Sequence, residues 1–463
     1  PKWSSASTTT ATHSNGFKKL VGSRSQSTML SNATFLYTRA YEAATDKLGE
    51  FVHLDIHGAA PVTTQRAGLV VATASLTNKQ DILDAYDDAG NNINGASTSA
   101  SSNRYTWINS GKLTVEGGNT SITNHYDHSD NSNYKSIVIN TGDILFQPYY
   151  DGTNYFQKYT SAFVMSLDGN SVHHIMYNGP TGSIKTYTSV ASLFLSGSSS
   201  SGRPLSIVNK GLLEMYGENS AGIYLKTGST TDLRFLDGGN YKPIAIYGDK
   251  SIGFYGESTN SSTKGDIAID IGGLGKGNQK FSSVTTNGVV LSNYDVNPSS
   301  TDENIEGSFG IISNAPISLT SHQIRIYDKT NGNVGVYPKS NVELDLGGGV
   351  IELLKGEKNI GVYIGGVGSV KSAGSVKLDG GLGNFAIYAI GGSIPILSTE
   401  NVNVSKVDSL NTKNSISVYA SGGSIVKTGE LNMVGATVEV DASTGNKKDS
   451  GAVFATGAGT VVT

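Results

Sequence analysis

Several residue types and patterns are scarce or missing in this sequence. It contains no cysteine, which excludes disulfide bonds, thiolate metal sites and cysteine nucleophiles. Only 10 residues are proline, and charged residues make up 16% of the chain, against about 25% in ordinary domains. No apolar run approaches the roughly 18 residues that a transmembrane helix needs. The net charge of −4 offers no basic surface to phosphate, which argues against nucleic acid as a partner.

Glycine and small polar residues take the place of what is missing. Glycine accounts for 58 of 463 residues, well above the typical share of about 7%. Serine, threonine and asparagine are also abundant, and all four are poor helix formers. Valine, isoleucine, leucine and 23 tyrosines recur in short runs typical of strands. The composition therefore predicts an all-β protein.

A repeat is visible from about residue 200. GENSAGIY at 217–224 returns as GDKSIGFY at 248–255 and GEKNIGVY at 356–363. Weaker copies are GNVGVY at 332–337, GNFAIY at 383–388 and NSISVY at 414–419. Because the tyrosines share one phase of the repeat, we expect them to be structural residues stacked along a solenoid: Tyr224, Tyr255, Tyr337, Tyr363, Tyr388 and Tyr419.

The spacing of about 25–31 residues identifies the architecture. It is too short for propeller blades of about 40–45 residues and too long for hexapeptide coils, and the leucine and asparagine spacing of leucine-rich repeats is missing. A right-handed parallel β-helix remains, with its handedness taken from the crossover rule. Asparagine and serine are expected to form ladders from coil to coil. GGLGKG at 272–277 fits neither a Walker loop nor a calcium repeat, and GGLG at 380–383 lacks the aspartate of that repeat, so both strings are predicted coil corners.

Three regions are expected along the chain. Residues 1–30 are predicted to be an extended lead-in, and residues 31–135 a helical and loop-rich cap with irregular strands. The cap would hold helices over 33–48 and 78–87, and would cover the open strand edge at the end of the solenoid. Residues 136–463 are predicted to be the β-helix. Since the chain starts at Pro1 without a leader and stops in mid-pattern, we expect it to be an excised piece whose coils continue.

Two groups of histidine and aspartate are weak candidates for a metal site. His53, Asp55 and His57 alternate along a predicted strand and would share a face, as metal ligands must. An edge strand with solvated polar groups explains them equally simply, so no metal and no cofactor is expected. A second group, His125, Asp127, His128 and Asp130, is better explained as a solvated loop, and His173 and His174 would point to opposite faces.

A polysaccharide-processing enzyme is the main alternative, because such enzymes occur on this fold. It would need two carboxylates close together for acid and base roles. The candidates are Asp87 with Asp88, Asp266 with Asp270, and Glu343 with Asp345. The DD, HG and RIK motifs of polygalacturonase-like enzymes stand here in the wrong order, so we expect no catalysis.

The best candidate for ligand binding is an aromatic run, PYYDGTNYFQKY at 148–159. A Gly-Thr-Asn turn divides two aromatic arms, which suggests a protruding hairpin or loop. Exposed tyrosines provide rigid contact area with a hydroxyl, suited to protein and sugar alike. Core filling in an irregular coil is the competing explanation. The predicted contact residues are Tyr149, Tyr150, Tyr155, Phe156 and Tyr159.

The GENSAGIY and GEKNIGVY units, the Gly/Asn/Ser-rich strands, the missing cysteine and the LYTRAYEAATDKLGEFVHLDIHG stretch at 36–58 resemble passenger segments of autotransporters. The likeness is firmest over 200–463 and points to the very large fusobacterial outer-membrane adhesins of the RadD type, whose relatives include a galactose-binding lectin. It implies a monomeric adhesin and virulence factor on the bacterial cell surface, which binds host-cell receptor proteins or glycans and coaggregates with other bacteria. The family's leader and C-terminal membrane barrel are absent from this stretch, so contact with the outer membrane is expected only through that barrel. A toxin passenger and a structural spacer without a ligand of its own are further alternatives.

Overall fold

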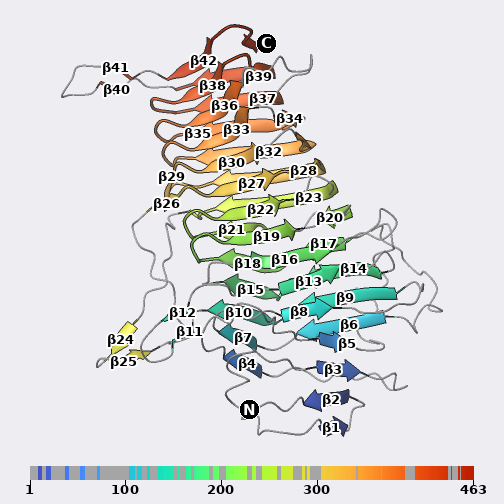
Figure 1. Cartoon of the computed structure of the whole chain (residues 1–463). Coiled ribbons are helices and arrows are strands. Elements are labelled where there is room, and N and C mark those ends of the chain that lie inside the picture. Colours follow the sequence, from blue (N-terminus) through green and yellow to red (C-terminus); the bar gives the residue numbers. More distant parts are fainter. Residues whose placement is uncertain are drawn as a thin grey trace. The chain divides into compact units, whose positions relative to one another are not determined.

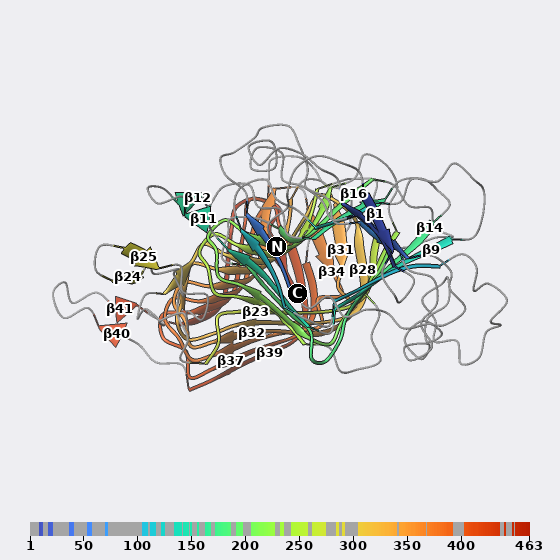
Figure 2. The ribbon, with the colours of Figure 1, turned by 90° about the horizontal axis from the view of Figure 1, so that it is seen from below.

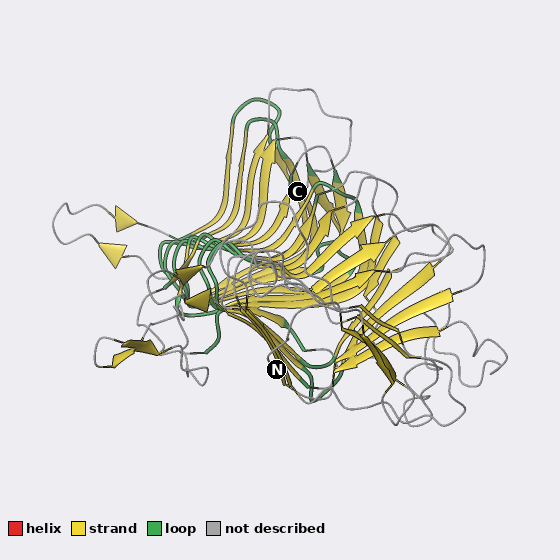
Figure 3. Ribbon diagram, turned by 60° about the horizontal axis from the view of Figure 1, so that its bottom comes forward, coloured by secondary structure: helices red, strands yellow, loops and turns green. Residues whose placement is uncertain are grey.

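The computed structural model of the chain consists of strands and the turns between them (Figure 1). None of the described residues is helical, and Figure 3 accordingly shows only strands and loops. Nor does any described residue belong to a helix long and apolar enough to cross a membrane. The structure describes residues 9–12, 17–21, 37–40, 53–57, 70–72, 104–109, 112–116, 122–125, 134–140, 142–147, 149–150, 155–156, 163–167, 172–186, 191–197, 205–226, 232–235, 242–257, 262–274, 284–286, 289–291, 304–339, 342–366, 368–391, 402–435, 439–440, 447–448 and 450–463.

The chain divides into two compact units. The first comprises Pro1–Glu214, Ile223–Lys242 and Ser283–Asp295, and the second comprises Met215–Gly222, Pro243–Ser282 and Val296–Thr463. Strands β18 (Leu212–Met215) and β19 (Ala221–Lys226) lie where the chain passes between them.

Strands of the first unit pair in parallel rows. One row is β4 (His53–His57), β7 (Lys112–Glu116), β10 (Asp143–Gln147) and β15 (Ser183–Thr186). A second is β6 (Arg104–Asn109), β9 (Tyr134–Asn140), β14 (Val172–Asn178), β17 (Leu205–Asn209) and β20 (Asp232–Phe235). A third is β8 (Ile122–His125), β13 (Phe163–Leu167) and β16 (Ala191–Gly197). The described part of the first unit is thus built of strands, as the composition predicts.

The N-terminal strands correct part of the sequence prediction. β1 (Thr9–Thr12) and β2 (Phe17–Val21) pair antiparallel within the predicted lead-in. β3 (Tyr37–Ala40) pairs antiparallel with β2 and parallel with β5 (Val70–Ala72). The helix predicted over 33–48 is therefore wrong at these four residues, where aromatic and β-branched side chains favour a strand that has partners on both edges. Its remaining residues, and the helix predicted over 78–87, lie outside the described residues.

The second unit has one row of strands that all carry the repeat. These strands pair in parallel in the order β22 (Ile252–Gly256), β27 (Phe309–Ser313), β30 (Val334–Pro338), β33 (Ile360–Gly366), β36 (Phe385–Gly391), β38 (Ile416–Ser421) and β42 (Gly451–Thr456). Each strand pairs with the equivalent strand of the next coil, as a β-helix requires.

A second set of parallel strands completes these coils. The long strands are β23 (Ser262–Ile271), β28 (Ile317–Ile326), β37 (Val402–Leu410) and β39 (Ile425–Val434). Between β28 and β37 each coil has two shorter strands, β31 (Glu343–Asp345) with β32 (Gly348–Leu354) and β34 (Ser369–Lys371) with β35 (Ser375–Asp379). The smaller pairings are β21 (Ile244–Ile246) with β23, β43 (Val461–Val462) with β39, β26 (Ile305–Glu306) with β29 (Thr330–Asn331), and the antiparallel hairpin β40 (Glu439–Val440) with β41 (Lys447–Lys448).

Alternation along each strand sets the core of the second unit. In β28, Leu319, Ile324 and Ile326 are buried, while Ser318 and Thr320 between them are exposed. The facing row contributes residues such as Phe254 and Val362, which are also buried. Since side chains alternate between the two faces of a strand, one face of each coil fills the interior and the other meets solvent.

A ladder of buried asparagine and serine side chains joins the corners of successive coils. The backbone N–H of Asn333 donates to Oδ1 of Asn359 over 2.9 Å, and that of Asn359 donates to Oδ1 of Asn384 over 2.9 Å. Serines continue the ladder on both sides, Ser308 and Ser251 on one and Ser415 and Ser450 on the other. These side chains take up N–H groups that the corner leaves without a strand partner, and this is the predicted coil-to-coil ladder.

The repeat tyrosines form a second ladder, on the outer face. Tyr363, Tyr388 and Tyr419 occupy consecutive register positions and are half-buried, and their rings stack. Tyr337 and Phe454 extend the row at its two ends. These contacts confirm the structural role predicted for the repeat tyrosines of these coils.

The predicted all-β, parallel β-helical solenoid is thus confirmed. The described part of the first glycine string, 272–274, and the second string, 380–383, fall at corners as predicted, with Gly272, Gly380, Gly381 and Gly383 at positive φ. The right-handed sense and the three regional boundaries stay predictions.

Candidate functional site

The aromatic run of the first unit forms a hairpin outside the parallel rows. β11 (Tyr149–Tyr150) and β12 (Tyr155–Phe156) pair antiparallel, with Tyr149 opposite Phe156 and Tyr150 opposite Tyr155. The two strands form a sheet of their own, inserted between β10 and β13. The antiparallel pairing agrees with the hairpin, one of the two shapes that the sequence suggested for this run. Tyr159 lies outside the described residues.

A second hairpin of the first unit escaped the sequence analysis. β24 (Val284–Thr286) and β25 (Val289–Leu291) pair antiparallel across a two-residue connection, Asn287–Gly288. Asn-Gly between runs of β-branched residues is the strongest short signal for a tight hairpin, and it would have predicted this one. Figures 1 and 2 show both hairpins outside the stacked rows of strands. The first unit thus has two inserted hairpins, each forming a sheet of its own.

The weak metal candidates lie on one strand, as predicted. His53, Asp55 and His57 alternate along β4, opposite Lys112, Thr114 and Glu116 of β7. His53 is therefore in register with Lys112. Among the residues that the structure describes, no group of three histidine, aspartate or glutamate side chains is arranged to hold a metal ion. No ligand set is assigned here.

The second histidine group falls only partly within the described chain. His125 ends β8, whereas Asp127, His128 and Asp130 lie outside the described residues. His173 and His174 are consecutive residues of β14, so they face opposite sides of the strand, as predicted.

Of the carboxylates considered for catalysis, Asp270 and Asp345 form ion pairs, and the candidates grouped with them, Asp266 and Glu343, lie on β23 and β31. Oδ1 of Asp270 accepts from Nε of Arg325 over 2.7 Å, and Oδ2 accepts from Nη2 over 2.9 Å. Asp345 lies 3.8 Å from Nζ of Lys371 on the next coil. Asp87 and Asp88 lie outside the described residues. Burial raises the pKa of Asp270, although the hydrogen bonds from Arg325 oppose the rise.

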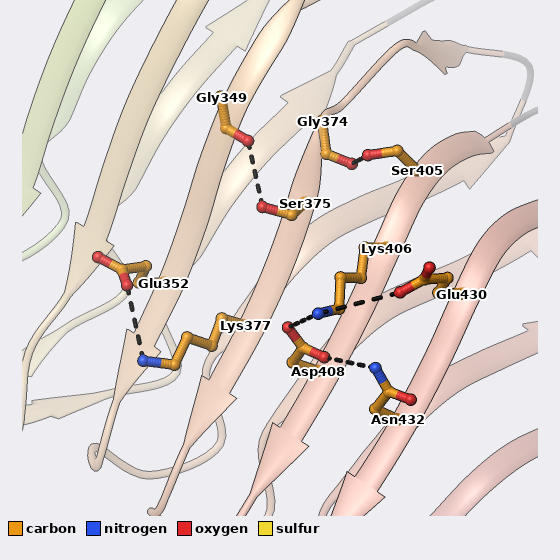
Figure 4. A network of polar contacts seen from close by, with 10 residues as sticks. All are labelled: Gly349, Glu352, Gly374, Ser375, Lys377, Ser405, Lys406, Asp408, Glu430 and Asn432. Atoms are coloured by element: carbon orange, nitrogen blue, oxygen red, sulfur yellow. Dashed lines mark hydrogen bonds and ion pairs between the residues drawn. The ribbon is translucent and has the colours of Figure 1, made fainter.

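The Asp270–Arg325 pair belongs to a column of polar and charged residues on the outer face of the second unit. Five register pairings place Asp270, Arg325, Glu352, Lys377, Asp408 and Asn432 side by side on successive strands. Figure 4 shows the later members of the column, where Lys377 approaches Glu352 to 3.8 Å and Nδ2 of Asn432 donates to Asp408 over 3.0 Å. Cross-strand neighbours of opposite charge stabilise the strand register in which they meet. The column therefore favours the observed pairing of these strands over one in which like charges would be neighbours.

The column shifts the protonation of two of its members, Lys377 and Asp408, toward their charged forms. The hydrogen bond to Asp379 is the largest cause of the raised pKa of Lys377. Burial would raise the pKa of Asp408, but hydrogen bonds from Asn432 and Lys406 outweigh it and lower the pKa. Charged, paired groups of this kind suit a structural role better than proton transfer, which needs a pKa near the working pH.

Loss of the Arg325 guanidinium is expected to destabilise the coils of the second unit. In Arg325→Met the Asp270 carboxylate, 12% exposed, would lose its only ion-pair partner among the described residues. Because Arg325 itself is 26% exposed and solvent screens the pair, we expect a loss of about 2 kcal/mol, below the 3–5 kcal/mol of a fully buried pair. Urea denaturation of the variant measures the change. The double variant Asp270→Asn/Arg325→Met should recover part of the loss, and equal stability of the two variants would contradict this account.

His322 is a buried titratable group that the sequence analysis did not single out. It is 1% exposed, its Nδ1 lies 2.9 Å from the carbonyl oxygen of Leu346, and its Nε2 has no hydrogen-bond partner within the described chain. Burial lowers the pKa of His322, and the hydrogen bond to Leu346 opposes this only in part. The imidazole is therefore neutral in the folded coil at neutral pH.

This burial predicts a loss of stability in mild acid. The unfolded chain binds a proton at His322 near pH 6.5, whereas the folded chain binds it only at lower pH. The contribution of the neutral His322 side chain to the free energy of unfolding is complete above about pH 6.5, and it is lost as the pH falls below that value. His322→Gln should make the free energy of unfolding less dependent on pH between 7 and 5, by up to about 1.4 kcal/mol per pH unit. Urea titrations at several pH values test this, and identical slopes for both proteins would contradict it.

Comparisons of the chain with family models, with curated proteins and with solved structures found no match in any of the three. What the site does must therefore be argued from its own geometry.

Proposed function

We propose that this chain is a passenger segment of a large autotransporter adhesin of the bacterial cell surface. In this proposal the β-helix is a rigid stalk, and inserted hairpins contact a host-cell receptor protein or glycan, or a partner bacterium. The observation that carries the proposal is the aromatic hairpin β11–β12, which forms its own sheet instead of joining the parallel rows.

The solenoid architecture is suited to this role. Each coil depends mainly on its neighbours, so an insertion at one corner leaves the rest of the ladder intact. Three antiparallel hairpins are inserted in this way, β11–β12, β24–β25 and β40–β41. Of these, β11–β12 consists entirely of aromatic residues, which are enriched at protein interfaces because they give large contact area at low entropic cost.

An enzymatic alternative would use paired carboxylates on adjacent coils. One member of each described candidate pair, Asp270 and Asp345, is instead close to a cation, Arg325 and Lys371 respectively. This arrangement favours binding over catalysis as the proposed function. The enzymatic alternative is tested by incubating the protein with acidic polysaccharides and measuring cleavage of the polysaccharide.

The binding proposal is tested by immobilising the chain and measuring its binding to host immune-receptor ectodomains, to a glycan array and to partner bacteria. In one variant Tyr149, Tyr150, Tyr155 and Phe156 are replaced with serine. The matched control replaces the four strand residues of β40–β41 with serine: Glu439, Val440, Lys447 and Lys448. Loss of binding in the aromatic variant alone is expected. Equal binding by all three proteins would overturn the site, and absence of binding by the unmodified chain would overturn the adhesive function.

A further inference from the structure

The outer face of the second unit holds tyrosine rings in van der Waals contact on neighbouring coils. Tyr388 of β36 and Tyr419 of β38 are direct register partners. Their ring centroids are 4.7 Å apart and their planes differ by 11°. Tyr363 stacks on the other side of Tyr388, at 5.9 Å and 15°. The three rings therefore stack with nearly parallel planes.

Both rings are held in place yet reach the surface. Tyr388 and Tyr419 are half-buried, and they alternate along their strands with the fully buried Ile387 and Val418. The ring of Phe385 packs edge-on against both of them, at 5.1 Å and 6.3 Å. Two phenols are thus fixed side by side where a small oxidant in solution can reach them.

We propose that Tyr388 and Tyr419 are a modification site, at which a peroxide-dependent one-electron oxidant joins the two coils through a dityrosine bond. This inference does not depend on the adhesive function.

The chemistry balances with hydrogen peroxide as the oxidant. Each phenol gives up one electron and its hydroxyl proton to form a phenoxyl radical. The radicals couple through a new carbon–carbon bond between ring carbons ortho to the oxygens. The hydrogen on each coupling carbon then leaves as a proton and each oxygen regains one, which restores two phenols. Overall two tyrosines and one hydrogen peroxide give one dityrosine and two water molecules.

Geometry favours this pair over its neighbours. Tyr337 and Tyr363 have centroids 5.1 Å apart but planes 60° apart, so their ring carbons do not superpose. Phe454 stacks on Tyr419 at 5.0 Å and 7°, but it has no hydroxyl to oxidise. Holding two reactive groups in contact raises their effective concentration far above that of groups on separate molecules. Coupling within one chain should therefore exceed coupling between chains.

The pKa of Tyr388 is consistent with this chemistry. Burial raises it, and the neighbouring Tyr419 and Tyr363 raise it further. The phenol is therefore protonated at neutral pH, and the hydroxyl proton must leave together with the electron.

The experiment treats the full chain with a peroxidase and hydrogen peroxide at low protein concentration, followed by proteolysis and mass spectrometry. The expected result is dityrosine fluorescence from the monomer and a linked peptide pair containing Tyr388 and Tyr419. Tyr419→Phe should abolish that pair and leave a Tyr363–Tyr388 pair as the main product. Phenylalanine is a safe substitution because Phe454 already occupies the same row.

Tyr337→Phe is the matched control, and it should leave the 388–419 pair unchanged. Dityrosine only between separate chains, or an undiminished yield of intramolecular dityrosine in a Tyr388→Phe variant, would overturn the assignment. Hydrogen exchange of β36 and β38 adds a second readout, because a bond between the coils should slow the exchange of their amides.

Discussion

Replacing Gly381 with alanine is expected to lower the free energy of unfolding of the second unit by about 3–4 kcal/mol. Gly381 stands at a coil corner with a φ of 85°, where an L-residue pays roughly 1–2 kcal/mol. A Cβ at this position would lie 2.0 Å from the carbonyl oxygen of Lys355 and 2.2 Å from Nδ2 of Asn384. One of these atoms is backbone and the other belongs to the asparagine ladder, so neither moves cheaply, and such overpacking adds about 1–3 kcal/mol.

Gly332→Ala is the control for this prediction. Gly332 has a similar φ of 65°, but nothing lies within 4 Å of its Cβ position. Only the conformational cost should remain, roughly 1–2 kcal/mol. Urea denaturation of both variants, with hydrogen exchange of the coil around β36, measures the difference. Equal destabilisation by the two substitutions would show that the close approach of coils at Gly381 is not real.

Interrupting the asparagine ladder at Asn359 is the second large effect, with an expected loss of about 3 kcal/mol in Asn359→Ala. Oδ1 of Asn359 accepts from the backbone N–H of Asn333 over 2.9 Å, and its Nδ2 donates to Oγ1 of Thr330 over 2.9 Å. The side chain is fully buried. Its removal would leave a buried N–H without a partner, at about 1–3 kcal/mol, and open a cavity in the corner.

Serine provides the matched substitution for Asn359. Ser308 and Ser415 hold equivalent places in the ladder, and Oγ of Ser415 accepts from the N–H of Asn384. Asn359→Ser should therefore cost at least about 1 kcal/mol less than Asn359→Ala, the worth of one hydrogen bond. Thermal denaturation of the two variants gives this difference. If serine proved as costly as alanine, the ladder would not be the source of the stability.

The fold of the second unit was predictable because one physical pattern recurs in every coil. Tyrosine, glycine and asparagine or serine return at the same phase, and each residue type has a fixed structural role. Tyr388 stacks on its neighbours, Gly381 forms the turn, and Asn384 bonds to the next coil. The N-terminal region has no such repeat. There helical spacing around Tyr37–Ala40 competed with β-propensity, and pairing with distant strands decided the outcome.

The candidate site was predictable only in part. The aromatic arms around Tyr150 and Tyr155 predicted the hairpin, because the turn and both strands are local in sequence. The second hairpin, β24–β25, was equally local, because its Asn-Gly turn and both strands lie within residues 284–291, but the sequence analysis did not use that signal. The pairing of Asp270 with Arg325, by contrast, was hidden, since 55 residues separate them.

The most direct test of the stacked coils uses the absence of cysteine from the chain. In Asp345→Cys/Lys371→Cys the two thiols would occupy register partners on β31 and β34. The control, Asp345→Cys/Lys427→Cys, places the second thiol on β39, two strands beyond β34 through β37. At about 4.8 Å per strand the control thiols are roughly 14 Å apart. If the coils are parallel and stacked, a short bifunctional thiol-reactive crosslinker should rapidly join the two cysteines of the first variant and should not join those of the second. Unreacted thiols in the first variant, or equal crosslinking in both, would contradict the stacked parallel coils.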